Sequence, residues 1–292
     1  MSTTDPAASQ RAKRQRRAGD RRFLRGAIAA AAGMVAFAFL FGLGIATTVD
    51  MLRHFAIDST FDDRLPYPMF WGPGTLGFLW ILGLGGLIAG SSAASHLLDA
   101  YRGGELQPRI LASLAAGAVA VAVVVDAPTW LDPLEVGVTL DPVFHEDTPW
   151  GAAEWIAYYA DRWFPALALV IAGLVVAFSI RHYRRLRRQI ADRNRLLREG
   201  RRTMGTITDA AQRTTTNDQG QRSVVGVEVT VKFTDDRGVD RWVIRFSRGR
   251  SALPGRGFAA VLFDPLRPSV DDLIFVSFYP DPTPAEWIGP EI

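Results

Sequence analysis

Long apolar runs separated by short polar stretches fill the first 180 residues, and a different pattern follows them. The runs cover residues 27–49, 73–96, 110–130 and 163–180. A helix rises about 1.5 Å per residue and crosses the hydrocarbon core of a bilayer in roughly 20 residues. The runs therefore predict four transmembrane helices that form a membrane domain over residues 27–180.

Positive charge between the runs orients the predicted helices. Lys and Arg number eight in residues 1–26, two in the connection between the second and third runs, and ten in residues 181–202. The other side holds only Arg53, Arg64 and Arg162. By the positive-inside rule both termini are cytoplasmic. Because the first run is too long for a signal peptide, we expect it to remain as an uncleaved helix.

Composition narrows the compartment and the chemistry. The chain has no cysteine, so it has neither a disulfide framework nor a thiolate metal site. Only two of its 33 basic residues are lysine, and Ala and Gly are abundant. This bias is typical of proteins encoded by GC-rich bacterial genomes, so we predict a multi-pass protein of the bacterial plasma (inner) membrane.

The predicted spans carry no Asp, Glu, Lys or Arg at their centres. Transporters and proton relays need ionisable groups at membrane depth, so the pattern argues against transport by this chain alone. Asp50 lies at the outer end of the first span, and Asp126 ends the apolar part of the third. We expect Asp126 at the interface, although the sequence leaves a position inside the membrane open.

Two features of the membrane domain concern packing. Gly86 and Gly90 are four residues apart, a spacing that lets helix backbones approach closely, either within one bundle or in a dimer. Five aromatic residues cluster before the fourth span and predict a helix in the headgroup zone, where aromatic belts are common. They are Trp150, Trp155, Tyr158, Tyr159 and Trp163.

Residues 181–202 are strongly basic and predict a helix that continues the fourth span. Leu186, Ile190 and Leu197 fall near one face at helical spacing. A basic cluster directly after a span is the arrangement that binds anionic lipid, and we favour this over nucleic acid. The predicted lipid-facing anchor comprises Arg181, Arg184, Arg185, Arg187 and Arg188.

After Gly200 the pattern changes to alternation, which predicts strands. The strands are expected at 204–211, 225–233, 241–246, 258–263 and 273–278. Five short strands predict a small all-β, barrel-like domain of OB or SH3 type over residues 203–280. Val225, Val227, Val229, Val231 and Phe233 are expected in its core, and so are Trp242, Ile244 and Phe246. The Pro-rich residues 281–292 predict a flexible tail.

This domain resembles the bacterial domain of unknown function 3592. The resemblance rests on VEVTVKFTDDRG, the strand after it and VLFDPLRPS, within residues 203–279. Phe263 stands where the family more often has Tyr, before Asp264, Pro265 and Pro268. The resemblance implies membrane attachment and a β domain, but no reaction or catalytic residue. The architecture is also similar to that of NfeD-like proteins, whose barrel meets a partner membrane protein.

Candidate chemistry is sparse. His145, Glu146 and Asp147 are adjacent, but adjacent residues seldom converge on one metal ion without further ligands, so a solvated loop is favoured. Ser91, Ser92 and Ser95 lie near His96 and Asp99 without a nucleophile-elbow motif, which favours polar packing at a helix end. We therefore predict no catalytic residue, no metal site and no cofactor.

The predicted function is that of a non-enzymatic membrane protein whose cytoplasmic β domain is a protein-interaction or assembly module. Its partners would be anionic membrane lipid and either a second copy or another membrane protein. Residues 203–292 carry a net charge of −2, which argues against nucleic acid. The alternatives are an accessory subunit of a transporter or membrane enzyme, and an enzyme that uses the outer acidic loop. The sequence does not identify the partner, the process or a ligand.

Overall fold

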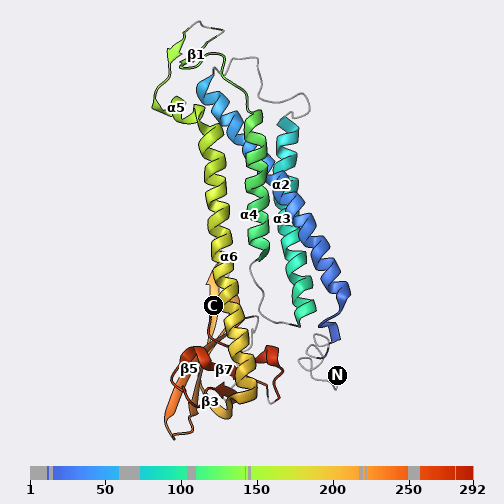
Figure 1. The fold of residues 1–292 in the computed structure, drawn as a ribbon, viewed down its shortest axis with the longest axis vertical. Helices are drawn as coiled ribbons and strands as arrows, with labels where there is room; N and C mark the ends of the chain where they lie inside the picture. The colour runs from blue at the N-terminus through green and yellow to red at the C-terminus, as the bar shows by residue number, and fades with distance from the viewer. Residues whose placement is uncertain are drawn as a thin grey trace. The chain divides into compact units, whose positions relative to one another are not determined.

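The structure is a computed structural model. It describes residues 12, 16–58, 73–103, 110–141, 143, 146–216, 220, 222–248, 257–279 and 281–291. The chain divides into two compact units (Figure 1). The helical unit comprises residues 1–103 and 107–181, and the β unit comprises residues 104–106 and 182–292.

Five helices make up most of the helical unit. They are α2 (Arg21–Ile57), α3 (Pro73–Arg102), α4 (Ile110–Asp126), α5 (Ala152–Tyr158) and α6 (Ala160–Glu199), whose last part belongs to the β unit. Between α4 and α5 lie η1 (Ala127–Thr129), β1 (Val138–Thr139) and β2 (Thr148–Pro149). The four helices α2, α3, α4 and α6 are each long and apolar enough to span a membrane. The predicted helical region is therefore present.

Helix α2 packs against both α3 and α4 in this unit (Figure 1). Small residues make the close approaches. A Cβ atom at Gly86 would collide with the Phe37 ring, and one at Gly90 would lie 3.0 Å from the Met34 backbone. Both glycines therefore lie on the face of α3 that contacts α2. Gly42 allows α2 the same close approach to α4, because a Cβ at this position would lie 2.8 Å from the Val119 carbonyl oxygen.

The β unit is built on one antiparallel sheet. Its strands are β3 (Arg201–Thr216), β4 (Arg222–Thr234), β5 (Asp240–Arg248), β6 (Phe258–Phe263) and β7 (Ile274–Ser277). Two 3-10 turns, η2 (Asp271–Leu273) and η3 (Pro284–Glu286), follow β6 and β7. The strand order is β5-β4-β3-β6-β7. The predicted strands are all present, and the sheet forms because alternating residues bury one face.

Strand β3 bends in the middle of the sheet. Its first part pairs with β6 and its longer second part with β4, and the register shifts between Ile207 and Asp209. Such a bulge increases the local twist of a strand. Gly205 lies just before it, where an added Cβ would lie 2.6 Å from the Val231 side chain. The bend therefore curls the sheet around its inner face.

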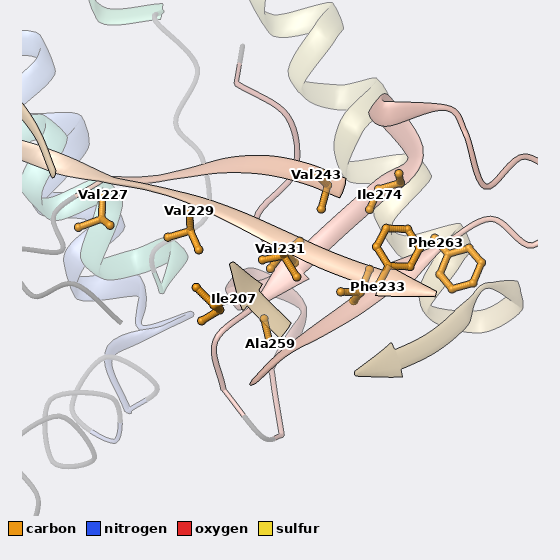
Figure 2. Packing of buried hydrophobic residues seen from close by; sticks show 11 residues of the cluster. Ile207, Val227, Val229, Val231, Phe233, Val243, Ala259, Phe263 and Ile274 are labelled. Atoms are coloured by element: carbon orange, nitrogen blue, oxygen red, sulfur yellow. The ribbon is translucent and has the colours of Figure 1, made fainter. Parts of the chain in front are cut away.

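The inner face of this curled sheet carries the core (Figure 2). Val227, Val229, Val231 and Phe233 of β4 are each at most 2% exposed, which confirms their prediction as core residues. Val225 is 43% exposed, because it lies near the start of β4, beyond the buried part of the strand. The remaining core residues come from all other strands: Ile207, Val243, Ala259, Val261, Phe263, Ile274 and Val276.

The predicted barrel-like domain is present but does not close, because no backbone ladder joins the edge strands β5 and β7 among the described residues. A side chain crosses the seam instead. Arg245 of β5 donates to the Ile274 carbonyl of β7 at 2.6 Å and to the Asp271 carbonyl at 2.7 Å. Its guanidinium also lies 3.0 Å from the Asp271 carboxylate. The sheet is thus an open, barrel-like curl that an arginine bridges.

The predicted core face of β5 is also wrong. Trp242 and Ile244 are 58% and 57% exposed, whereas Val243 and Arg245 are 2% exposed. The hairpin register explains the inversion, because Val243 lies opposite Val231 of β4. Residues directly opposite each other in an antiparallel pair share a face. Of the three β5 residues predicted in the core, Trp242 and Ile244 therefore lie exposed on the outer face, and Phe246 is half-buried.

The second part of α6 covers the outer face at β6 and β7. Leu196 packs there against Leu262, Phe275 and Trp287. The tail joins this cluster, since Ile288 exchanges backbone hydrogen bonds with Val276 at 2.8 and 2.9 Å. Residues 281–291 therefore pack onto the domain, which differs from the flexible tail that the proline content predicts. Apolar contacts of Trp287 supply the anchor.

Asp235 organises the hairpin between β4 and β5. Its carboxylate accepts hydrogen bonds from the backbone amides of Val239 and Arg237 and from the Arg241 guanidinium at 2.8 Å. Gly238 completes the turn with φ +78°, a backbone conformation that glycine adopts without strain. The Val239 amide, followed by the Arg241 side chain, lowers the pKa of Asp235 below its ordinary value.

This lowered pKa predicts an acid-sensitive hairpin. The charged carboxylate stabilises the folded state above the unfolded pKa of about 3.9, and that stability is lost as the pH falls through the folded pKa. The protection factor of the Val239 amide in the full chain, which is its exchange rate relative to the intrinsic rate at the same pH, should therefore fall at acid pH. Asp235→Asn should exchange faster at neutral pH and show less pH dependence. The exposed neighbour provides the control variant Asp236→Asn, because its carboxylate lies 3.3 Å from the Arg201 guanidinium and outside the hairpin turn's hydrogen bonds to Asp235.

Candidate functional site

Four apolar side chains on the outer face of the β unit are exposed to solvent. They are Met204 of β3 (62% exposed), Trp242 (58%) and Ile244 (57%) of β5, and Phe258 of β6 (72%). We call them the outer strip. The register aligns Phe258 with Thr206, Thr206 with Lys232, and Lys232 with Trp242 across four strands. Monomeric soluble domains seldom expose large side chains in such groups, so the strip is a candidate interaction surface.

The outer strip continues a surface that is already an interface within the chain. Met204 lies directly opposite Ala260 of β6, and Ala260 packs against the cluster under α6. The outer face therefore carries apolar side chains on β7, β6, β3 and β5, interrupted by Thr206 and Lys232 where β3 pairs with β4, and α6 covers only one end of it. The same sheet face that binds an amphipathic helix at β6 and β7 presents unpartnered apolar side chains at β3 and β5.

Charged residues around the outer strip pair with one another. The Lys232 ammonium lies 2.6 Å from the Asp240 carboxylate and 5.3 Å from the centre of the Trp242 ring. Arg213 lies 2.6 Å from Glu228 and 3.1 Å from Glu291. The hydrogen bond to Glu291, followed by the one to Glu228, raises the pKa of Arg213 above its ordinary value. The negative charges of both carboxylates act in the same direction. The strip therefore has a rim whose charges are compensated.

The arginines of the predicted lipid anchor lie on α6. Arg181, Arg184, Arg185, Arg187 and Arg188 are all exposed. The buried face of this stretch consists of Leu186, Gln189, Arg193 and Leu196. Ile190 and Leu197 are only half-buried, so the helix presents a more polar face to its domain than the leucine spacing predicts.

A buried charged cluster at the end of α2 is the site that sequence reasoning missed. It consists of Asp50, Arg53, His54 and Asp58, each at most 5% exposed. Arg53 lies 3.4 Å from Asp50 and donates to the Leu131 carbonyl at 2.6 Å. His54 Nδ1 lies 3.1 Å from Asp58 Oδ2.

This cluster holds the segment between α4 and α5 onto α2. Asp58 accepts a hydrogen bond from the Leu134 amide, and the Ile57 carbonyl accepts from the Trp150 indole at 3.2 Å and from Thr139. Trp150 is only 8% exposed, so it is a buried contact rather than the interfacial ring predicted from the sequence. The cluster's role is to position the connecting segment.

The signal for the cluster was the spacing of its residues. Asp50, Arg53, His54 and Asp58 repeat at intervals of three and four residues, which places them on one face of a helix. The apolar run ends at Val49, but α2 continues for two more turns to Ile57. Hydropathy alone therefore placed Asp50 at the outer end of the first span and did not extend the helix over the other three residues.

The other chemical candidates have local contacts of their own. Phe144 and His145 lie outside the described residues, and Asp147 accepts a hydrogen bond from the Asp141 amide at 3.0 Å. Ser91 donates back to the Ile88 carbonyl of its own helix at 2.9 Å. Asp126 ends α4 and accepts from the Trp130 indole at 3.1 Å. Within the part of the chain that the structure describes, no three metal-capable side chains gather.

Comparison of the chain with known protein families, with curated proteins and with solved structures gives no match. The resemblances to the domain of unknown function 3592 and to NfeD-like proteins therefore stay predictions. The outer strip, its rim and the buried charged cluster are the observations from which a function can be inferred.

Proposed function

We propose that this chain is a non-enzymatic membrane protein whose cytoplasmic β unit is a protein-interaction module. The distribution of arginine along the sequence supports the cytoplasmic assignment. The observation that carries the proposal is the outer strip, in which four large apolar side chains are each more than half exposed. Interfaces are rich in such aromatic and Met side chains.

The outer strip docks an apolar segment of a partner membrane protein. The rim charges are already paired within the chain, so a charged ligand would gain little by approaching them. An apolar segment would bury Trp242, Ile244, Met204 and Phe258 without breaking those pairs. Continuity with the surface under α6 supports a helical segment, because the same outer face already binds the apolar side of a helix.

Burial of the strip supplies enough free energy for specific recognition. Fully burying a large apolar side chain contributes about 1.5–3 kcal/mol. Trp242 is also an aromatic residue held in place by Lys232, and rigid aromatic anchors dominate the energetics of many interfaces. We therefore place the energetic centre of the docking surface at Trp242.

Photocrosslinking in intact cells tests the proposal. A photoreactive residue at Ile244 should give one dominant adduct, identified by mass spectrometry, with a second membrane protein. The matched control carries the photoreactive residue at Leu266, which is 83% exposed but lies outside the strip. Arg241, which the alternation suggests as an outward position, is a poorer choice because it bonds to Asp235 at 2.8 Å.

A further substitution makes the result quantitative. Trp242→Ala should lower the Ile244 adduct by about tenfold, since truncation of an interface hot spot costs roughly 2 kcal/mol or more. Arg237→Ala, which removes an exposed cation in the β4–β5 turn outside the strip, should leave most of the adduct. Adducts of equal yield from Ile244 and Leu266, or adducts only between copies of the chain, would contradict docking of a partner protein.

A further inference from the structure

A polar pocket in the β unit adjoins the rim of the outer strip through Glu291, which pairs with Arg213. It has a volume of about 360 Å³ and lies between the helix α6, the η2 turn and the C-terminal tail. Its lining residues are Arg185, Arg188, Gln189, Asp192, Asp272, Pro290 and Glu291. Sites for small ligands fall in the range of roughly 300–1,000 Å³, so the pocket has the size of a small-ligand site.

One buried atom of a residue that lines this pocket is unsatisfied. Gln189 is 9% exposed, and its amide nitrogen donates to the Pro290 carbonyl at 2.9 Å. Its Oε1 atom is buried and accepts no hydrogen bond from any residue that the structure describes. An unpaired buried acceptor costs about 1–3 kcal/mol, so a ligand that donates a hydrogen bond there would be favoured.

The charges of the pocket have both signs. Arg185 and Arg188 are exposed and lie one helical turn apart on α6, and no ion pair to another described residue holds either guanidinium. Asp272 is likewise exposed, and its charge acts on the Arg245 guanidinium. The other two carboxylates have partners, since Glu291 lies 3.1 Å from Arg213 and Asp192 lies 3.9 Å from Arg195. The pocket therefore offers cations for a phosphate and a carboxylate for an ammonium group.

We infer that this pocket binds a phosphoethanolamine group. Its phosphate would lie against Arg185 and Arg188, because guanidinium groups bind phosphate through paired hydrogen bonds. Its primary ammonium would lie near Asp272 and donate to Gln189 Oε1. A quaternary choline group has no N–H with which to satisfy that oxygen, and a purely anionic headgroup gains nothing from the carboxylate.

The position of the pocket along the chain points to a lipid as the source. Arg185 follows Ile180, the last residue of the fourth apolar run, by five residues of continuous helix. Five helical residues advance about 7.5 Å, so the pocket-lining arginines begin within the reach of the headgroup layer. A free phosphoethanolamine carries the same groups, and the experiment distinguishes the two sources.

Lipid retention by the full chain tests the site. The chain is purified in detergent, incubated with equal amounts of phosphatidylethanolamine, phosphatidylcholine and phosphatidylglycerol, and examined by native mass spectrometry. Phosphatidylethanolamine should be retained in preference to the other two. Arg188→Ala should lower its retention by about fivefold, the effect of one basic residue at a lipid surface.

Arg187→Ala is the matched control. Arg187 is exposed in the same turn of α6 and lies over the Tyr183 ring at 5.2 Å, but it does not line the pocket. It should change retention by less than Arg188→Ala. Equal losses would show attraction by the basic helix as a whole and would overturn the pocket.

Asp272→Asn identifies the ammonium partner. This variant should lose the preference for phosphatidylethanolamine over phosphatidylglycerol, because it removes the negative charge that only the former exploits. An unchanged preference in Asp272→Asn would overturn the assignment, and so would an unmodified chain that shows neither a lipid preference nor stabilisation by the soluble compound. Soluble O-phosphoethanolamine is the second probe: stabilisation of the lipid-free chain by this compound, with no lipid preference, would assign a free metabolite, whereas preference for the lipid alone assigns the headgroup.

Discussion

Arg53→Ala should give the largest loss of stability in the helical unit. Arg53 and Asp50 are both 5% exposed and lie 3.4 Å apart, and Arg53 also donates to the Leu131 carbonyl at 2.6 Å. Removing one partner of a buried ion pair leaves the other charge uncompensated, which typically costs about 3–5 kcal/mol. Residues 127–159 should then separate from the end of α2.

Hydrogen exchange of the full chain in detergent measures this loss. Amides of α5 and of the segment before it should exchange faster in Arg53→Ala, together with a lower unfolding temperature. The control is Arg162→Ala, because Arg162 is exposed and lies 3.9 Å from Asp161. An exposed pair contributes about 1 kcal/mol or less. Similar exchange in the two variants would mean that the buried cluster does not hold the segment.

A double variant separates the ion pair from the carbonyl contact. In Asp50→Asn with Arg53→Ala, no buried carboxylate is left uncompensated, so the double variant should lose less than the sum of the two single variants. Both Arg53→Ala and the double variant would lack the hydrogen bond to the Leu131 carbonyl. Strict additivity would show that Asp50 and Arg53 do not interact.

Arg245→Met should destabilise the β unit by about 3 kcal/mol, the scale for a buried hydrogen-bonded charge that loses its site. Arg245 bridges the open seam between β5 and β7, where it donates to the Ile274 and Asp271 carbonyls. Desolvation lowers the pKa of Arg245, and the nearby Asp271 opposes that shift. Methionine has a similar length but no hydrogen-bond donor in its side chain. The backbone carbonyls of Ile274 and Asp271 would therefore lose their hydrogen bonds from residue 245.

Exchange of the β7 amides in the full chain reports on this seam. Arg245→Met should accelerate exchange of β7 and of the end of β5, whereas β3 and β4 should change less. Lys232→Ala is the control, because it removes a cation from the exposed outer face of the neighbouring strand. Equal protection of β7 in both variants would contradict the bridging role of Arg245.

The sequence by itself determined the coarse architecture. Apolar runs of transmembrane length specify helices whatever packs around them, and the alternation from Val227 to Phe233 places that face of β4 inside. The strand β6 was predicted with the bounds that the structure shows, Phe258–Phe263, because Gly and Pro punctuate both ends. Local periodicity was sufficient in each case.

Tertiary structure decided the features that depend on partners distant in the sequence. The β5 residues offer two apolar alternations, and only pairing with β4 turns Val243 inward and Trp242 outward. The seam between β5 and β7 stays open because Arg245 fills it, a contact between residues 29 positions apart. Charged residues at the end of α2 are buried because the segment around Leu131 folds over them. Periodicity reports which residues share a face, but burial of that face depends on what the rest of the chain brings to it.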